Sequence, residues 1–174
     1  MRRGVAVTLS GVALVASCVV ASPLASWEVE HEQEIAARPA TVWQVLTDLS
    51  RYPEWNPYSR RVEGTLRVGE RVRVEAHLGG EVRVVENRVT RLEAPRTLCW
   101  ESQGWYAQLA RGTRCRNLET LPDGSTRLVH HEVMDGPLAW LIERLYRPRI
   151  EAGLRDEDGA LAAAAEAAER EGSQ

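Results

Sequence analysis

The sequence contains no lysine and no phenylalanine, and only three of its 174 residues are cysteine. Without lysine, neither a Schiff-base lysine nor a phosphate-loop lysine is available, so both kinds of site are excluded. The 22 basic residues are all arginine and stand against 25 acidic ones, which gives a net charge of −3. That balance offers no argument for a nucleic-acid partner.

Familiar catalytic and metal-binding motifs are also missing: the sequence has no CxxC, complete HExxH, GxGxxG, GxSxG or phosphate loop. The segment His130-His131-Glu132, with Asp135, resembles part of a zinc peptidase motif. However, it reads as a strand, and neighbouring residues on a strand point to opposite faces, so the two histidines cannot hold one metal. We therefore expect no metal site and no cofactor. Acid/base chemistry is the one enzymatic route that remains.

Residues 1–26 form a distinct leader, in which two early arginines precede an uncharged, apolar stretch over residues 5–21. This pattern predicts a secretory signal or an N-terminal membrane anchor. The segment ending at Cys18 resembles a lipoprotein cleavage box, with Cys18 as the lipidated residue; cleavage between residues 21 and 26, and an uncleaved anchor, are the alternatives. We expect an exported or membrane-anchored protein on the periplasmic or extracellular face. The other alternative is a cytoplasmic protein with an apolar extension.

A folded domain is predicted over residues 27–165, because alternating and helical patterns follow each other without a linker. Trp27, Val29, His31 and Gln33 share one face of a first strand, and the glutamates between them form an acidic solvent face. An amphipathic helix follows from Pro39, and residues 52–57, Tyr-Pro-Glu-Trp-Asn-Pro, predict a rigid turn because proline stops the helix. Residues 59–63 read as a second short helical turn.

Five further strands are predicted from period-two alternation and turn signals, over residues 71–78, 81–92, 97–102, 112–121 and 126–134. Gly79-Gly80 has the composition of a two-residue hairpin turn. From Pro137 an apolar stripe at helical spacing predicts a long helix, which Pro148 should kink or interrupt. Residues 161–169 are alanine-rich and predict a solvated helical end, and residues 166–174 a disordered or frayed tail.

This order of elements predicts an α+β fold, and several segments resemble the START-like polyketide cyclase/dehydrase (SRPBCC) superfamily. The resemblance spans residues 28–165 and is carried by residues 40–43, 46–48 and 52–57, Val68-Gly69, Leu98, Trp100, Glu132 and Gly136. It implies a helix-grip fold, in which a curved antiparallel sheet of six or seven strands wraps a long C-terminal helix. One or two short helices follow the first strand. It also implies a deep, mostly apolar cavity between sheet and helix, which in family members receives lipids, sterols, quinones or polyketides.

Alternation decides which side chains face that cavity. If Leu118 and Leu128 point inward, then Arg114, Arg116, His130 and Glu132 do so as well. Buried charges must be paired, and arginine suits bidentate capture of a carboxylate, a phosphate or a carbonyl. The alternatives are a structural ion pair that sets strand register, or arginine stems that reach to the rim. We expect the ligand-binding residues to be Trp55, Trp100, Arg114, Arg116, His130, Glu132 and Met134.

Aromatic side chains at Trp55, Trp100, Trp105 and Tyr106 fit a rim around the cavity mouth, with ordinary core and edge packing as the alternative. Cys99 and Cys115 point to the outer face and lie opposite each other if their strands pair about a centre near Ala107. Export would permit a disulfide there, and two free thiols are the alternative.

Two functions follow from this pattern, and a third stays open. The first is a protein that binds a hydrophobic small molecule or lipid, with membrane association through its N-terminus. The second is a cyclase- or dehydratase-type enzyme with His130 as general base and Glu132 as its orienting partner; for His130 the alternative is a cavity histidine that Glu132 merely satisfies. The third is a partner-binding module that uses the outer face of the sheet.

Overall fold

The computed structural model describes residues 25–172 and confirms the α+β helix-grip fold. The predicted leader, including Cys18, lies outside the described residues. The elements are β1 (Ser26–Ile35), α2 (Pro39–Thr47), η1 (Leu49–Arg51), α3 (Tyr52–Trp55), β2 (Ser59–Gly64), β3 (Arg71–Leu78), β4 (Glu81–Glu93), β5 (Thr97–Ser102), η2 (Trp105–Gln108), β6 (Arg111–Thr120), β7 (Thr126–Asp135) and α4 (Ala139–Gly172).

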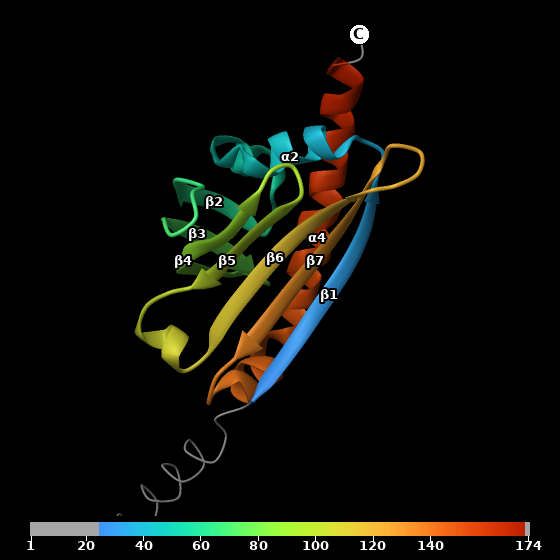
Figure 1. The fold of residues 1–174 in the computed structure, drawn as a ribbon. Coiled ribbons are helices and arrows are strands. Elements are labelled where there is room, and N and C mark those ends of the chain that lie inside the picture. The colour runs from blue at the N-terminus through green and yellow to red at the C-terminus, as the bar shows by residue number, and fades with distance from the viewer. Residues whose placement is uncertain (1–24, 173–174) are drawn as a thin grey trace, which may run out of the picture.

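One curved sheet carries all the strands, in the order β1-β7-β6-β5-β4-β3-β2, and every neighbouring pair is antiparallel. Helix α4 lies against its concave face, and α2 covers one end (Figure 1). Antiparallel strands with one buried face show hydrophobic-in, polar-out alternation. The strand β7 keeps the period-two burial, but two of its buried side chains, His130 and Glu132, are polar. No helix in residues 25–172 has the length and apolar character needed to cross a membrane.

Residues 59–63 were wrongly predicted as a helical turn, because they form strand β2 along the sheet edge. A β-bulge between Ser59 and Arg61 explains the error. The extra residue lengthens the spacing between the buried side chains of Ser59 and Val62 from two to three. That spacing imitates a helix in the sequence.

The segment after α2 is more helical than predicted. Tyr52–Trp55 forms one turn of α-helix, with Pro53 in its first turn, where a missing N–H costs nothing. The chain then turns around Asn56, whose Oδ1 accepts hydrogen bonds from the backbone N–H groups of Tyr58 (3.0 Å) and Ser59 (2.6 Å). The aromatic, proline-rich stretch therefore begins as a helical turn, and its rigidity stays a prediction.

Helix α4 is longer than predicted. It continues through Pro148, so the alternative that Pro148 interrupts the helix is wrong, and it reaches Gly172. Its alanine-rich part is not solvated: Leu161, Ala162 and Ala165 are buried in the core beneath α2. Small side chains allow the two helices to approach closely, so this segment packs where its composition indicates a surface helix.

A polar layer divides the apolar core into two clusters. One lies beneath α2 and includes Leu128 and Leu161; the other lies towards the start of β1 and includes Trp27 and Leu154. Between them, His130 and Glu132 interrupt β7, Arg114 and Arg116 occupy the inner face of β6, and Glu157 and Asp158 lie on α4.

Candidate functional site

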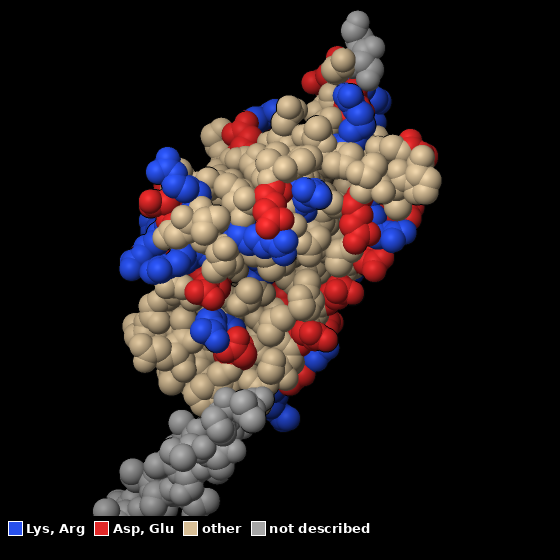
Figure 2. Space-filling view, viewed as in Figure 1, with Lys and Arg blue, Asp and Glu red and all other residues tan. Residues whose placement is uncertain are grey.

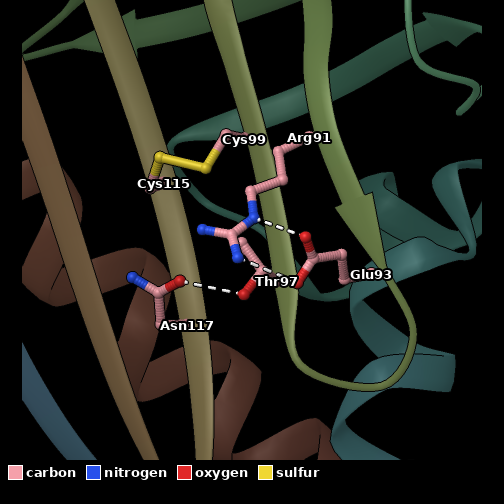
Figure 3. The surroundings of a disulfide bond; sticks show 6 residues. All are labelled: Arg91, Glu93, Thr97, Cys99, Cys115 and Asn117. Atoms are coloured by element: carbon pink, nitrogen blue, oxygen red, sulfur yellow. Dashed lines mark hydrogen bonds and ion pairs between the residues drawn. A yellow bond between two sulfur atoms is a disulfide. The ribbon is translucent and has the colours of Figure 1, made fainter.

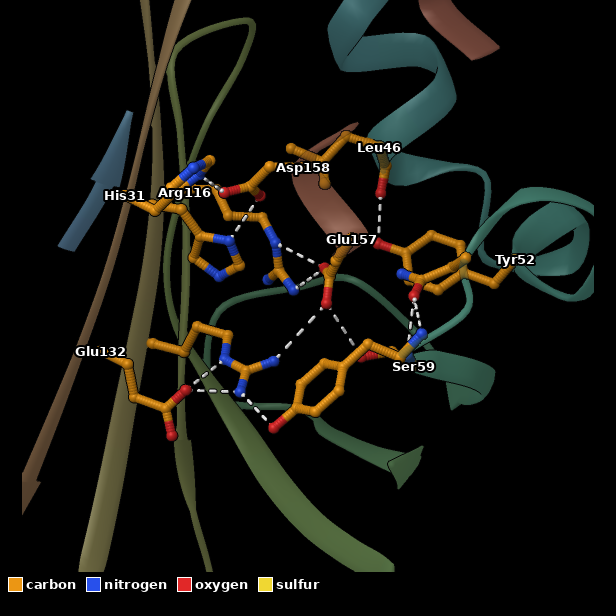
Figure 4. A network of polar contacts seen from close by, with 12 residues as sticks. His31, Leu46, Tyr52, Ser59, Arg116, Glu132, Glu157 and Asp158 are labelled. Atoms are coloured by element: carbon orange, nitrogen blue, oxygen red, sulfur yellow. Dashed lines mark hydrogen bonds and ion pairs between the residues drawn. The ribbon is translucent and has the colours of Figure 1, made fainter. Parts of the chain in front are cut away.

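The polar layer is built where β6, β7 and α4 face one another. Arg114 and Glu132 are register partners across β6 and β7, as are Arg116 and His130. All four side chains are buried on the concave face, as alternation from Leu118 and Leu128 predicts. The sheet therefore presents two adjacent rows of polar groups to the helix (Figure 4).

Arg114 binds two partners on the sheet side of the layer. Its Nε donates to Oε2 of Glu132 at 2.8 Å, and its Nη2 donates to the same oxygen. Nη2 also donates to the hydroxyl of Tyr58 at 3.0 Å, and the guanidinium lies over the Tyr58 ring. Arg114 is thus a paired, hydrogen-bonded group that ties β6 to β7 and to the start of β2.

Arg116 is paired with Glu157, which reaches the layer from α4. Nε of Arg116 donates to Oε1 of Glu157 at 3.1 Å, and Nη2 donates to the same oxygen. The other carboxylate oxygen, Oε2, accepts a hydrogen bond from the Ser59 hydroxyl at 3.3 Å and lies 3.6 Å from Nη1 of Arg114. The guanidinium of Arg116 lies over Trp100, 4.6 Å from the ring centroid.

His130 is oriented by Asp158 of α4. Its Nδ1 lies 2.6 Å from Oδ1 of Asp158, and Nδ1 of His31 lies 2.8 Å from Oδ2 of the same carboxyl. We expected Glu132 to be the partner of His130, and this is wrong: Glu132 is held by Arg114. The interaction that orients the imidazole comes from the helix and not from the neighbouring strand position.

Two buried nitrogens of the layer have no hydrogen-bond partner among residues 25–172: Nη1 of Arg116 and Nε2 of His130. Arg116 is 1% exposed and His130 is fully buried. Buried polar groups are almost always hydrogen-bonded, and each exception calls for an explanation. The two residues are register partners on adjacent strands.

Burial shifts the titration of the Asp158–His130 pair towards the neutral forms. Burial, and next the negative charge of Glu157, raise the pKa of Asp158 from 3.8 to about 8. Burial, and next the positive charge of Arg116, hold the pKa of His130 well below its ordinary value of 6.5. Near neutral pH the pair is therefore uncharged, with one proton on the Asp158 carboxyl.

One of the two positions of that proton makes both free nitrogens donors. A neutral carboxyl has one O–H to donate, and Oδ1 of Asp158 faces Nδ1 of His130. If the carboxyl donates there, the imidazole proton is on Nε2. Nε2 of His130 is then a donor without a partner, as is Nη1 of Arg116.

Within residues 25–172, charged side chains occupy the place at the polar layer where the resemblance implies a deep apolar cavity. Arg114, Arg116, Glu132 and Glu157 occupy the space between sheet and helix and contact one another directly. A pocket of about 190 Å³ lies instead beside β2, β3 and β4, where it is lined by Arg61, Glu63, Arg73, Glu75 and Val84. Its charged lining does not suit an apolar ligand.

The remaining predicted ligand-binding residues lie apart from one another. Trp100 is in the layer, beneath Arg116, and Met134 packs against the cluster that contains Trp27. Trp55 packs edge-on against Tyr52, beneath the α2 end of the fold, with a ring-centroid separation of 4.9 Å. Trp105 lies in η2 at the opposite end (Figure 1), so these aromatic rings do not form one rim.

Cys99 and Cys115 form a disulfide between β5 and β6 (Figure 3). They are register partners with Cα atoms 4.2 Å apart, as pairing about Ala107 predicts. The bond lies on the outer face, beside Arg91 of β4, which pairs in register with Cys99. The structure therefore has the disulfide and not the two free thiols that were the alternative.

Sequence reasoning missed both acidic residues of α4. Glu157 and Asp158 were overlooked because residues 155–158 are all charged, and a run of charges on a helix is typical of a solvated face. Their spacing does contain a signal: they lie three and four residues after Leu154 and before Leu161, both fully buried, which places them on the apolar side of the helix. Within residues 25–172 no cluster of histidine, cysteine or acidic residues could hold a metal ion.

Comparison with known proteins identifies relatives of the fold. A family model described as "Polyketide cyclase / dehydrase and lipid transport" matches residues 26–166. The Zhui aromatase/cyclase from Streptomyces sp. R1128 aligns with a TM-score of 0.67 and 21% identity, covering 82% of this chain and 94% of that chain. Norcoclaurine synthase from Thalictrum flavum aligns with a TM-score of 0.63 and 14% identity, covering 80% and 93%. At these identities the likeness concerns the fold alone. No curated protein matches the sequence significantly.

Proposed function

This chain belongs to the polyketide cyclase/dehydrase and lipid transport family, and we propose that it binds a hydrophobic small molecule bearing a neutral oxygen acceptor. The membership confirms the START-like resemblance. In this proposal the ligand enters the polar layer between the sheet and α4, where the closely packed side chains must shift to admit it, and its oxygen accepts hydrogen bonds from Nη1 of Arg116 and Nε2 of His130. Trp100, beneath Arg116, borders the same location.

The observation that carries this proposal is the pair of unpartnered nitrogens. Leaving one buried donor unsatisfied costs about 1–3 kcal/mol, and here two lie on adjacent strands. A single acceptor oxygen relieves both costs at once. Binding at this location is therefore favoured by the hydrogen bonds that the free protein lacks.

Charge accounting favours a neutral oxygen over the carboxylate or phosphate that remained open from the sequence. Arg114 and Arg116 are balanced by Glu132 and Glu157, so the layer has no surplus positive charge. Asp158 holds its proton near neutral pH, since its pKa is about 8. An anionic ligand would bring an uncompensated charge into a buried site, which is far more costly than burying a carbonyl.

A matched set of ligands tests the chemistry of the site. The aromatic ketone 1-tetralone, its oxygen-free analogue tetralin and the anion 1-naphthoate are titrated against the protein, with tryptophan fluorescence as the signal. We expect 1-tetralone to bind at least 10-fold more tightly than either of the others. Equal affinity for 1-tetralone and tetralin would contradict the proposal, and so would preference for 1-naphthoate.

Variants assign the binding to the two nitrogens. His130→Phe should abolish the preference for the ketone, because it removes one donor. His131→Phe is the matched control, since His131 is the next residue on β7 and points to the other face. Replacing Arg116 alone would leave the Glu157 carboxylate buried without a partner. Arg116→Gln combined with Glu157→Gln keeps the layer neutral and should also lose the preference for the ketone. A ligand found by native mass spectrometry of the protein from its own host would then give the natural compound.

A second candidate function is acid/base catalysis by the Asp158–His130 pair. A carboxyl 2.6 Å from Nδ1 of a histidine, with Nε2 free, is the arrangement of an oriented general base. Once Asp158 ionises, above about pH 8, Nδ1 donates to the carboxylate and Nε2 becomes an acceptor. His130 could then remove a proton from the carbon beside the bound carbonyl, with the resulting enolate held by Arg116.

Deuterium exchange into 1-tetralone tests this second function. In heavy water, catalysed enolisation replaces the hydrogens beside the carbonyl with deuterium, which mass spectrometry counts. Catalysis predicts that exchange exceeds the buffer rate, increases above pH 8 and disappears in His130→Phe but not in His131→Phe. Tight binding without exchange supports the binding function alone.

We also propose that the protein is exported or held at a membrane by residues 1–26. The Cys99–Cys115 disulfide supports this, because disulfides persist in oxidising compartments and are rare in the cytosol. Fractionation of the native host, with mass determination of the mature N-terminus, distinguishes an uncleaved anchor, cleavage between residues 21 and 26, and lipidation at Cys18. Recovery of the full chain in the cytosol would refute the proposal.

A further inference from the structure

Three uncharged segments meet at the end of the sheet where β1 begins. Residues 25–27, 103–110 and 136–142 contain no charged side chain, although charged residues make up 27% of the chain. The backbone joins them there: Gly136 N donates to the carbonyl oxygen of Ala25 at 3.1 Å, and Leu138 N donates to that of Leu109 at 2.8 Å. We call this region, with the first turns of α4, the apolar end.

The apolar end exposes large hydrophobic side chains. Trp105 in η2 is 75% exposed, and in the first turns of α4 Trp140 is 50% and Leu145 54% exposed. Figure 2 shows a broad uncharged surface at this end, next to the point where the chain enters the described part. Exposed apolar groups that gather in this way mark an interaction surface.

An unpaired arginine accompanies these side chains. Arg144 is exposed, lies one turn after Trp140 on α4, and has no ion-pair partner among residues 25–172. Its neighbours on the helix differ, since Arg147 contacts Glu143 and Glu151 and Arg149 contacts Glu81. Tryptophan and arginine side by side are typical of a surface at the membrane–water interface, where rings lie among headgroups and arginine binds phosphate.

The chain outside the described residues indicates what covers this surface. The apolar stretch over residues 5–21 ends four residues before Ala25. Four extended residues span at most about 14 Å. If residues 5–21 enter a bilayer, the apolar end is held at its surface, and it is the only end of the domain that a tether of this length can bring there.

We propose that the apolar end docks on a lipid bilayer, with Trp105 and Trp140 in the headgroup region and Arg144 on lipid phosphate. The docking rests on insertion of the N-terminal segment and is independent of the ligand proposed for the polar layer. It orients the domain with α2 and the C-terminus of α4 away from the membrane.

Quenching of tryptophan fluorescence tests docking separately from anchoring. The full chain is reconstituted into vesicles of phosphatidylcholine brominated on its acyl chains, with a minor share of phosphatidylglycerol. Bromine quenches only rings that reach the bilayer. Because Trp105 and Trp140 are two of six tryptophans, we expect loss of roughly a third of the signal relative to non-brominated lipid.

A charge-reversal variant removes docking and keeps both reporter rings. Arg144→Glu combined with Leu145→Glu should reduce the quenching at least fivefold, while the anchor keeps the chain in the vesicle. Arg88→Glu combined with Val84→Glu makes the same change on the outer face of β4, where Val84 is 49% exposed, and should leave the quenching unchanged. Absence of quenching in the wild type, equal quenching in both variants, or a lipid-free dimer formed through this end would each overturn the proposal.

Discussion

Glu157 of α4 and Arg116 of β6 form an ion pair in the interior, in which each side chain is only 1% exposed. The pair joins the C-terminal helix to the middle of the sheet. A buried pair of this kind contributes little net stability, because removing two charges from water is expensive. The pair instead sets the position of α4, because any shift of the helix along the sheet would separate the two charges.

Breaking this pair should be costly. Glu157→Gln leaves the Arg116 charge buried without its partner, and we expect a loss of about 3–5 kcal/mol in the free energy of unfolding. Urea denaturation measures it. Arg116→Met combined with Glu157→Leu should recover most of the loss, since it removes both charges of the pair and Arg114 keeps Glu132 as its partner. On the surface, Glu93→Gln, which removes the exposed ion pair with Arg91 on the same strand, should leave stability nearly unchanged. Equal effects of Glu157→Gln and Glu93→Gln would contradict this account.

Stability should decrease as pH rises from about 4 to 8 because of Asp158. Its folded-state pKa of about 8 lies above the ordinary 3.8, so in this window the folded protein holds a proton that the unfolded chain releases. His130 has the opposite effect on stability. Because its pKa in the folded protein is well below 6.5, the unfolded chain takes up a proton first as pH falls, and stability decreases towards low pH.

Asp158→Asn separates the two effects, because it removes the first and leaves the second. We expect the difference in unfolding free energy between variant and wild type to move in favour of the variant by roughly a few kcal/mol between pH 4 and 8. Urea titrations at three pH values across the window measure this difference. A constant difference would show that Asp158 keeps an ordinary pKa.

Two glycines of α4 should respond oppositely to alanine. A Cβ at Gly153 would lie 2.3 Å from the ring of Tyr58, which supports Arg114, whereas a Cβ at Gly159 meets nothing within 4 Å. Gly153→Ala should destabilise the protein by about 1–3 kcal/mol. Gly159→Ala should stabilise it by about 0.5–1 kcal/mol, because alanine favours the helix. Thermal denaturation of the two variants gives both signs. Similar changes would mean that Tyr58 does not pack on Gly153.

The disulfide should be detectable and stabilising. The denatured, non-reduced chain should show no titratable thiol at Cys99 or Cys115, as mapped by alkylation and peptide mass. Cys99→Ser combined with Cys115→Ser should lower the free energy of unfolding by about 3 kcal/mol, since the bond closes a loop over a sequence separation of 16. Full alkylation of both residues before reduction would refute the bond.

Period-two alternation was sufficient for most of the sheet and for the direction of its polar side chains. Arg114 and Arg116 are tied to Leu118, and His130 and Glu132 to Leu128, because successive residues on a strand alternate faces. The same rule put Cys99 and Cys115 on the outer face, and strand pairing about Ala107 put them opposite each other. It failed at Ser59 and Val62, where a bulge changes the period without any mark in the composition.

The sequence by itself determined which residues of each element face inward, because that depends on local backbone geometry. Only the tertiary structure decided which of them meet. The partners of Arg116 and His130 come from α4 and depend on where that helix lies along the sheet and how it is rotated. The helical spacing of apolar residues predicts neither its position nor its rotation. The free nitrogens on Arg116 and His130, and with them the candidate site, follow from that placement.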